Sequence, residues 1–385
     1  MKITSKPMLP VLLVFALAIS LAFAGEDGAL LRVALLPPAD FSPTTSAWEG
    51  MSGRCGFEWV AFSPDTFVSD GSLNASDFPL AVYAGGERYC HTVERPGDGI
   101  TTVIRYLEEG GVLLVAGMCW PFYRPVDYVD GKWVPSRGAL PEFKGDPDPV
   151  LAEQMARFSQ DSSGNFNRFL GINIAGEGTR QFERPDEKVH FERCPAASPL
   201  FDLPDAFPFP VSGDQRYRPA SVRHTGEGWK ATPIITLKGS GGTEYGPGII
   251  VAAPQSPTAR GRVIYVWGTL FGTEYADEFV RGVLRLTMSR VELPGDLRAE
   301  LDAHAKRHRV LGDRLKSVEQ AVHRLSGETP FLPYLRRQLA TVRGLLAPVP
   351  DALLVGNASR SGVLLAEASE RFSRLSERVR QLESP

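Results

Sequence analysis

Cys119 is the residue of this chain best placed for chemistry, because it follows directly on a buried strand predicted at 111–117 (GVLLVAG). A cysteine thiolate is a nucleophile, but at neutral pH the thiol needs a neighbouring base or positive charge to form it. The histidines that could act as that base are His91, His190 and His224. His91 is the best placed of them. If the protein is an enzyme, we expect Cys119 with His91 or His224 to be its catalytic residues.

Short apolar runs separated by helix-sized segments precede this cysteine. They lie at 30–36, 57–62, 79–86 and 111–117. Runs that are apolar on both faces are typical of parallel strands covered by helices. A helix is predicted over 98–109. Its apolar stripe consists of Ile100, Val103, Ile104 and Leu107, and Gly110-Gly111 follows it.

The second half of this domain starts with a stretch rich in proline, glycine and aromatic residues. Within 118–232 a helix is expected at 149–158 and a strand near 187–193. Further strands are predicted at 234–239, 248–254 and 261–268, and a helix at 276–291. The Gly-rich run at 239–248 predicts a hairpin turn, because no Lys-Ser/Thr pair or helix follows it as in a phosphate-binding loop. Together these elements predict an α/β domain over 25–294, with a flavodoxin-like, doubly wound, mostly parallel sheet.

A helical region follows Pro294-Gly295. Mainly apolar residues step by three and four through three series, which predicts a helical hairpin or a coiled-coil-like three-helix bundle over 295–385. This region has 15 basic and 11 acidic residues, and the net charge of the whole chain is -3. Neither value is typical of a nucleic-acid-binding protein. His304 and His308 have a metal-binding spacing but no third ligand, so we expect them to be polar residues of a helix seam.

Ligands of doubly wound sheets gather outside the carboxyl ends of the strands. Cys90 and His91 follow the third strand, and Cys119 follows the fourth, so we expect all three at one edge of the sheet. The same edge should carry possible ligand-binding residues, which are Gly85, Gly86, Trp120, Tyr123 and Arg124. Aromatic side chains with polar tips beside an arginine could bind a sugar or another small molecule.

Over roughly residues 30–123 the chain resembles the class I glutamine amidotransferase-like superfamily. The resemblance is carried by the strand that ends in Gly85-Gly86, the helix that ends in YLEEGG, and the strand that leads to Cys119. It implies that Cys119 stands at the position of the nucleophile and Gly85-Gly86 in the oxyanion loop. Active members read G-x-C-x-G at this elbow, but this chain reads G-M-C-W-P, and no His-x-Glu follows strand 261–268. The resemblance therefore implies a degenerate, non-catalytic member.

Residues 1–24 are built like a secretory signal peptide, with a short basic start, an apolar stretch and an Ala-Phe-Ala site. We expect cleavage after Ala24, no stable membrane span afterwards, and a periplasmic or secreted protein. Cysteines of exported proteins are commonly paired. We expect a Cys90–Cys119 disulfide, because both residues follow the ends of adjacent strands, and the pairing of Cys55 and Cys194 is left open.

The sequence thus predicts an exported, non-catalytic binding or scaffold protein, with an amidotransferase-like domain and a helical tail for self-association or a protein partner. We expect no cofactor and no metal. Two alternatives stay open at this point. One is a cysteine-dependent amidase or hydrolase that uses Cys119 with His91 or His224, and the other is a carbohydrate-associated binding module.

Overall fold

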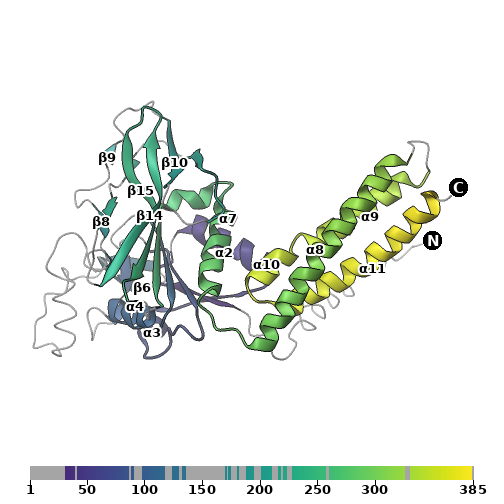
Figure 1. Cartoon of the computed structure of the whole chain (residues 1–385). Helices are drawn as coiled ribbons and strands as arrows, with labels where there is room; N and C mark the ends of the chain where they lie inside the picture. Colours follow the sequence, from purple (N-terminus) through teal and green to yellow (C-terminus); the bar gives the residue numbers. More distant parts are fainter. Residues whose placement is uncertain are drawn as a thin grey trace, which may run out of the picture. The chain divides into compact units, whose positions relative to one another are not determined.

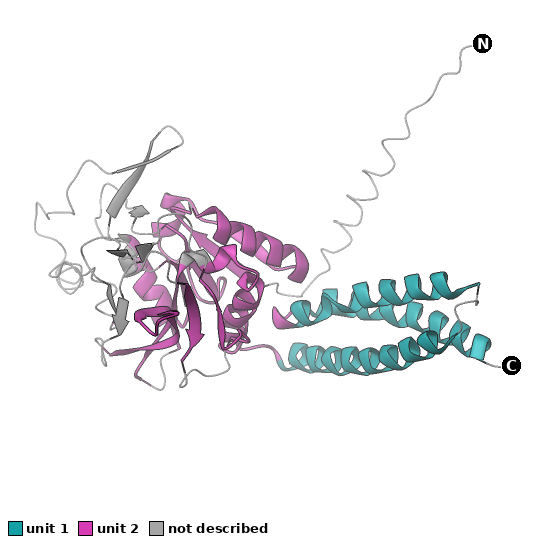
Figure 2. Ribbon diagram, turned by 90° about the horizontal axis from the view of Figure 1, so that it is seen from above, with its two compact units in different colours: residues 1–30, 295–353, 357–385 teal, residues 31–294, 354–356 magenta. Residues whose placement is uncertain are grey.

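The structure is a computed structural model of the 385-residue chain. It describes residues 31–39, 41–85, 88–90, 98–117, 124–129, 132–135, 170, 172–174, 180–181, 188–194, 201–209, 216–217, 220–222, 228–256, 260–325 and 330–383 (Figure 1). The described residues form two compact units (Figure 2). The α/β unit comprises 31–294 with 354–356, and the helical unit comprises 295–353 with 357–385.

A nine-stranded sheet is the centre of the α/β unit. Its order is β11 (Ala206–Pro208), β10 (Val189–Arg193), β14 (Trp229–Gly239), β15 (Glu244–Pro254), β16 (Arg262–Val266), β5 (Val112–Ala116), β3 (Leu80–Tyr83), β1 (Arg32–Leu36) and β2 (Glu58–Ala61). The strands from β16 to β2 run parallel to one another, whereas β15, β14, β10 and β11 each run antiparallel to the preceding neighbour. The sheet is therefore mixed, with a parallel half and an antiparallel half.

Helices cover both faces of the parallel half. α2 (Ser42–Cys55) and α7 (Ala276–Met288) pack on one face, and α3 (Pro64–Val68) and α4 (Asp98–Glu108) on the other. In β5, Val112 and Leu114 belong to the first core while Leu113 and Val115 belong to the second. Burial on both faces explains why the strands are continuous apolar runs in the sequence.

The turn between α4 and β5 needs both of its glycines. Gly110 has φ +102°, which an L side chain adopts only under strain. A Cβ atom on Gly111 would lie 2.2 Å from the ring of Tyr106. That ring is fully buried, its hydroxyl donates to the carbonyl of Val112 (3.0 Å), and burial raises the pKa of Tyr106 well above its ordinary value. The predicted helix and its glycine stop are confirmed.

The hairpin predicted from the Gly-rich run is also confirmed. β14 and β15 pair antiparallel, and the chain reverses through Ser240 to Thr243, with Gly242 at φ +86°. Gly242 has open space around it, so its backbone angle rather than a close contact favours glycine there.

The helical unit contains α8 (Gly295–Arg324), α9 (Leu332–Leu346), α10 (Val349–Leu354) and α11 (Ala358–Glu383). α8 and α11 run parallel, as the contacts of Arg307 with Ser369 and of Arg324 with Glu383 show, and α9 runs antiparallel to α8. The short helix α10 was missed by the three-helix prediction, which placed a break at 348–350. Pro350 lies in its first turn, where proline leaves no intrahelical hydrogen bond unmade.

The remaining described strands form smaller sheets. β4 (Arg88–Cys90), β6 (Arg124–Val129) and β7 (Lys132–Pro135) form one, β8 (Ile172–Ile174) pairs with β13 (Ala220–Val222), and β9 (Arg180–Gln181) pairs with β12 (Arg216–Tyr217).

Within the described ranges, no helix combines the length and the apolar character that crossing a membrane requires. The predicted signal peptide and the helix expected at 149–158 lie outside those ranges.

Candidate functional site

The carboxyl ends of β1, β3, β5 and β16 lie side by side, because these four strands are adjacent and parallel. We call this the carboxyl edge. It is the edge at which the sequence places the residues that follow 79–86 and 111–117. The chain continues from β1 into Pro37-Pro38, from β3 into Ala84-Gly85, from β5 into Gly117, and from β16 into the 3₁₀ helix η1 (Gly268–Gly272).

Gly85 has a packing reason to be glycine. A Cβ atom there would lie 2.6 Å from the carbonyl oxygen of Pro38 and 3.0 Å from two of its ring carbons. The segment after β3 therefore packs closely on the segment after β1. This contact by itself accounts for the first glycine of the Gly-Gly pair, independently of any role in binding an oxyanion.

The other predicted site residues are described only in part. Gly86, His91, Cys119, Trp120, Tyr123 and His224 lie outside the described residues, and so does the predicted Cys90–Cys119 disulfide. Cys90 and Arg124 lie in strands whose backbone is described. β4 and β6 pair in parallel, with Arg88 opposite Arg124 and Cys90 opposite Val126. The structure thus brings the segment after β3 and the segment after β5 together in one small sheet.

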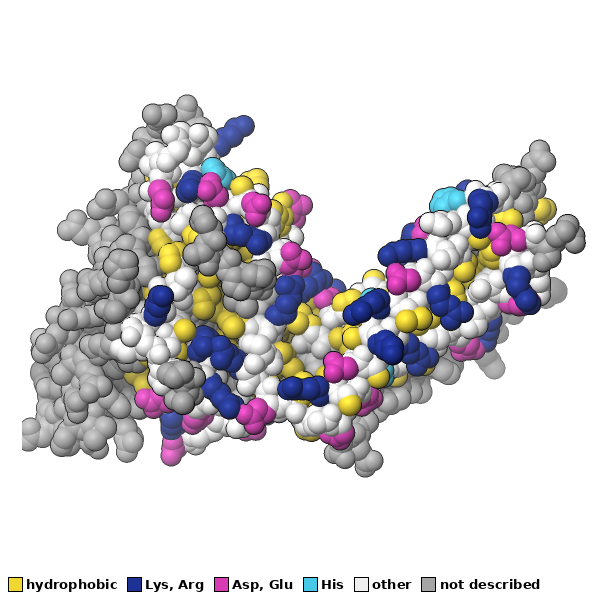
Figure 3. Space-filling view, viewed as in Figure 1, with side chains coloured by type: hydrophobic (Ala, Val, Ile, Leu, Met, Phe, Trp, Pro, Cys, Tyr) yellow, Lys and Arg dark blue, Asp and Glu magenta, His cyan; other side chains and the backbone are white. Residues whose placement is uncertain are grey.

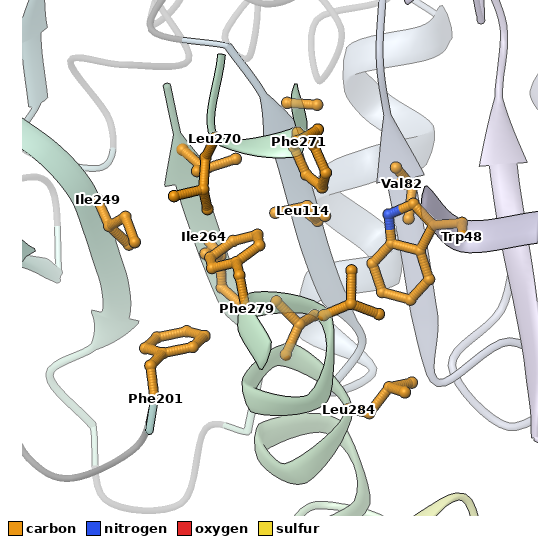
Figure 4. Packing of buried hydrophobic residues seen from close by; sticks show 14 of the residues in the cluster. Trp48, Val82, Leu114, Phe201, Ile249, Ile264, Leu270, Phe271, Phe279 and Leu284 are labelled. Atoms are coloured by element: carbon orange, nitrogen blue, oxygen red, sulfur yellow. The ribbon is translucent and has the colours of Figure 1, made fainter. Parts of the chain in front are cut away.

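The segment after β16 is filled by apolar side chains. Leu270 is fully buried and Phe271 is 5% exposed, and both belong to the core that α2 and α7 cover (Figure 4). The ring of Phe271 packs edge-on against Phe41 and Phe279, with ring centroids 6.4 and 5.6 Å apart. These two residues of η1 are therefore committed to the core and present no group that could accept a proton.

The first ionisable groups after η1 interact with each other. A hydrogen bond to the carboxylate of Glu274 raises the pKa of the Tyr275 hydroxyl. The ring of Tyr275 also lies 4.7 Å from that of Phe207. Tyr275 is thus held by its neighbours and is poorly suited to act as a base.

His190 is too far along the sheet to serve a nucleophile that follows β5. It lies on β10, which is four strand positions from β5, a separation of roughly 19 Å at ordinary strand spacing. Its Nε2 atom lies 3.6 Å from the carboxylate of Glu192. Lys238 donates to the same carboxylate at 2.6 Å, and this hydrogen bond lowers the pKa of Glu192. The group forms a polar surface on the antiparallel half.

The structure describes the side chains of two of the four cysteines, Cys55 and Cys194, and these are not paired with each other. The thiol of Cys55, buried at the end of α2, donates to Sδ of Met51 at 3.0 Å. Cys194 follows β10 and carries a free thiol, whose pKa is raised by burial and then by the charge of Glu244. The general expectation of paired cysteines therefore fails for Cys194, and a thiol with a raised pKa reacts slowly.

A polar cleft of about 330 Å³ lies at the opposite, amino edge of the sheet. Arg260 in its wall pairs with Glu292 at 2.7 Å, while Nε of Arg290 is buried without a partner. Glu109 also lines the cleft, as do residues at the carboxyl ends of α4 and α7, where the helix dipoles are negative. An anion would therefore meet two carboxylates and two negative helix ends. Sequence reasoning missed this cleft because its residues come from separate segments.

In the helical unit a serine of α11 lies close to a histidine and a glutamate of α8. Nδ1 of His304 lies 2.9 Å from Oγ of Ser361, and Nε2 lies 4.0 Å from Glu300. Ser361 is fully buried and donates its hydroxyl hydrogen to the carbonyl of Ala358 (3.0 Å), so it accepts the bond from His304. A serine in this arrangement is no nucleophile, because no substrate reaches it and its proton points away from the histidine.

His308 is likewise a structural residue, since its Nε2 donates to the carbonyl of Leu346 at 3.2 Å. His304 and His308 thus each join α8 to a neighbouring helix, as expected for residues of a seam. Within the described part of the chain, no three His, Cys, Asp or Glu side chains cluster closely enough to hold a metal ion.

No model of a known protein family matches this chain, and no similar sequence is found among curated proteins.

Proposed function

We propose that this chain is an exported, non-catalytic binding or scaffold protein. Its α/β unit would be a degenerate relative of the class I glutamine amidotransferases, and its helical unit would bind a protein partner. Export is supported by the signal-like residues 1–24 of the sequence. A mature chain that begins at Gly25 in amino-terminal sequencing of the exported protein would support that part.

The strand order supports the proposed relationship. In chain order the parallel strands are β1, β2, β3, β5 and β16, and in the sheet they follow the order β2, β1, β3, β5, β16. This is the 2-1-3-4-5 order of the flavodoxin-like fold, with helices on both faces. A fold by itself does not determine activity, because one fold serves many functions.

The observation that carries the proposal is the burial of Leu270 and Phe271. The resemblance implies that an active relative has its base and the residue that orients it after the strand equivalent to β16. Here the segment is closed into η1, with side chains committed to the core. A cysteine without a proton acceptor remains mostly a thiol at neutral pH, which is a weak nucleophile.

Site-specific thiol labelling tests the proposal on the full mature chain. The native protein is treated with iodoacetamide and each cysteine is quantified by peptide mass spectrometry. We expect Cys119 to stay unlabelled until denaturation, and to need reduction as well if it is paired with Cys90. Cys194 serves as the internal control for a free, partly buried thiol, which should be labelled slowly in the native protein because its pKa is raised.

Rapid native labelling of Cys119 would contradict the proposal, above all if the rate follows the titration of a histidine and falls in His91→Ala or His224→Ala. An amide-hydrolysing activity that Cys119→Ala abolishes would replace it with the cysteine-dependent amidase.

A further inference from the structure

A groove runs along the outer surface of the helical unit between α8 and α11. We call it the basic groove. Its volume is about 390 Å³. It is lined by Ala303, Lys306, Arg307, Val310, Leu311, Arg314, Ser369, Phe372 and Ser373.

The floor of the basic groove is apolar. Leu311 and Phe372 are 6% and 2% exposed and belong to the core of the bundle. Val310 is 49% exposed and adds apolar surface beside this floor. Burial of such a side chain by a partner contributes favourably, at about 25 cal/mol for each Å² of apolar surface removed from water.

The rim of the basic groove carries three cations and no carboxylate. Arg307 donates to the hydroxyl of Ser369 at 3.0 Å, and the guanidinium of Arg314 lies 5.1 Å from the ring centroid of Phe372. In the described part of the structure, neither of them nor Lys306 has a carboxylate within ion-pair distance. Lys306 and Arg314 lie eight residues apart on α8, which places them about 12 Å apart along one helix face.

Three arginines of α11 are arranged differently. Arg371, Arg374 and Arg380 of α11 each pair with a glutamate on the same helix. Figure 3 shows dark blue Lys and Arg side chains beside yellow hydrophobic ones on the visible face of the bundle. Because the cations of the basic groove have no such partner among the described residues, they remain available to carboxylates of another molecule.

We propose that the basic groove binds an acidic amphipathic helix of a partner protein, which lies along α8 and α11 as an additional helix. The proposal rests on the proposed function, in which the helical unit binds a protein partner. The partner helix would place apolar residues on Val310, Leu311 and Phe372 and carboxylates near the three cations. Amphipathic helices commonly bind such grooves through apolar residues spaced three and four apart.

Two other occupants fit less well. A second copy of the chain, bound through the same groove by two-fold symmetry, would bring two unpaired cationic rims together. An anionic membrane is flat on this scale, so it would contact exposed Val310 but not the buried side chains of Leu311 and Phe372.

Fluorescence anisotropy with a designed probe tests the inference on the full mature chain. The probe is a synthetic fluorescein-labelled helix of three heptads, with leucine on one face and glutamate on the rest, and the comparison peptide has lysine in place of glutamate. We expect the acidic probe to bind, the basic peptide not to bind, and the affinity of the acidic probe to fall as salt is raised.

Charge reversal locates the binding surface. Lys306→Glu combined with Arg314→Glu should lower the affinity for the acidic probe at least about tenfold, because two attractive contacts become repulsive. Val310→Glu should lower this affinity as well. Arg298→Glu combined with Arg309→Glu is the matched control, because it makes the same change of charge at two exposed positions of α8 outside the groove. All these positions are exposed, so the far-UV circular dichroism should stay unchanged.

Equal binding of both peptides, or an equal loss of affinity in the Arg298→Glu, Arg309→Glu control, would overturn the proposal, because either result indicates non-specific attraction. Binding to phosphatidylglycerol vesicles without binding of the acidic probe would assign the groove to a membrane instead. A dimer in sedimentation that the Lys306→Glu, Arg314→Glu variant abolishes would assign it to a second copy. Cys119→Ala should bind the probe normally, so the outcome for the groove is separate from the outcome of thiol labelling.

Discussion

Replacement of Phe271 by alanine tests whether the segment after β16 is held by packing. The side chain is 5% exposed, belongs to the core under α2 and α7, and packs edge-on against Phe41 and Phe279. Phenylalanine-to-alanine changes in a core cost about 3–5 kcal/mol, because the transfer free energy is lost and a cavity remains. We expect the free energy of unfolding of the α/β unit to fall by about 3–5 kcal/mol.

Tryptophan fluorescence during urea unfolding isolates this effect. All 6 tryptophans of the chain precede residue 295, so the signal reports the α/β unit and not the helical unit. Gly272→Ala is the matched control at the next position, since a Cβ there meets no atom within 4 Å and the backbone has no positive φ. We expect that control to change the free energy of unfolding by less than about 0.5 kcal/mol.

If Phe271→Ala lowers the free energy of unfolding by less than about 1 kcal/mol, with an unchanged slope against urea concentration, the reasoning is refuted. It would mean that Phe271 is not packed as described and that the segment after β16 is free to carry another function. Packing would then no longer exclude a catalytic base from this segment, whatever the reactivity of Cys119.

Three further substitutions have defined outcomes. In the unsubstituted protein, burial raises the Tyr106 pKa in the folded state, so above pH about 10 the unfolded chain releases a proton that the native one keeps. The free energy of unfolding then falls by up to about 1.4 kcal/mol per pH unit. Tyr106→Phe should remove this alkaline loss of stability. Urea unfolding at pH 9 to 11 measures this slope. Gly261→Ala should destabilise the α/β unit by more than about 3 kcal/mol in the fluorescence assay, because its Cβ would lie 2.1 Å from the backbone oxygen of Leu107. Gly312→Ala, in open space within α8, should stabilise the helical unit by about 0.5–1 kcal/mol in circular dichroism melts, and a loss there would show that α8 is strained at this point.

The parallel half of the sheet was predictable because its strands are buried on both faces. β5 extends over 112–116, within the predicted 111–117, and α4 ends one residue before the predicted end at 109. Helix α2 was not predicted. Its buried residues, Thr44, Trp48, Met51 and Cys55, have helical spacing, but apart from one alanine the positions between them hold polar residues and glycines. Its apolar stripe is therefore narrow, and the spacing of these four residues was the signal that could have revealed it.

The antiparallel half was harder to predict because strand direction leaves little trace in a short apolar run. β14 and β15 are 11 residues long, and their pairing shifts register between Pro233 and Lys238. The alternation of apolar and polar residues that marks a half-buried strand is broken at such irregularities. The hairpin turn itself was predictable, since glycine favours the positive φ at position 242.

The candidate site could be predicted as a location but not as chemistry, and the reason is physical. Which loops follow adjacent parallel strands depends on topology, and the apolar runs reveal enough of it to place Gly85 at the carboxyl edge. Whether a side chain there is available for catalysis depends on what it packs against, which spacing does not reveal. Leu270 and Phe271 are buried in the core, whereas Lys306 and Arg314 of the helical unit line a groove and have no carboxylate partner in the described ranges. A buried apolar side chain cannot be redirected without a loss of several kcal/mol, while an exposed cation without a partner can bind a new carboxylate with little reorganisation. The described residues therefore favour recognition by the helical unit over chemistry at the sheet edge.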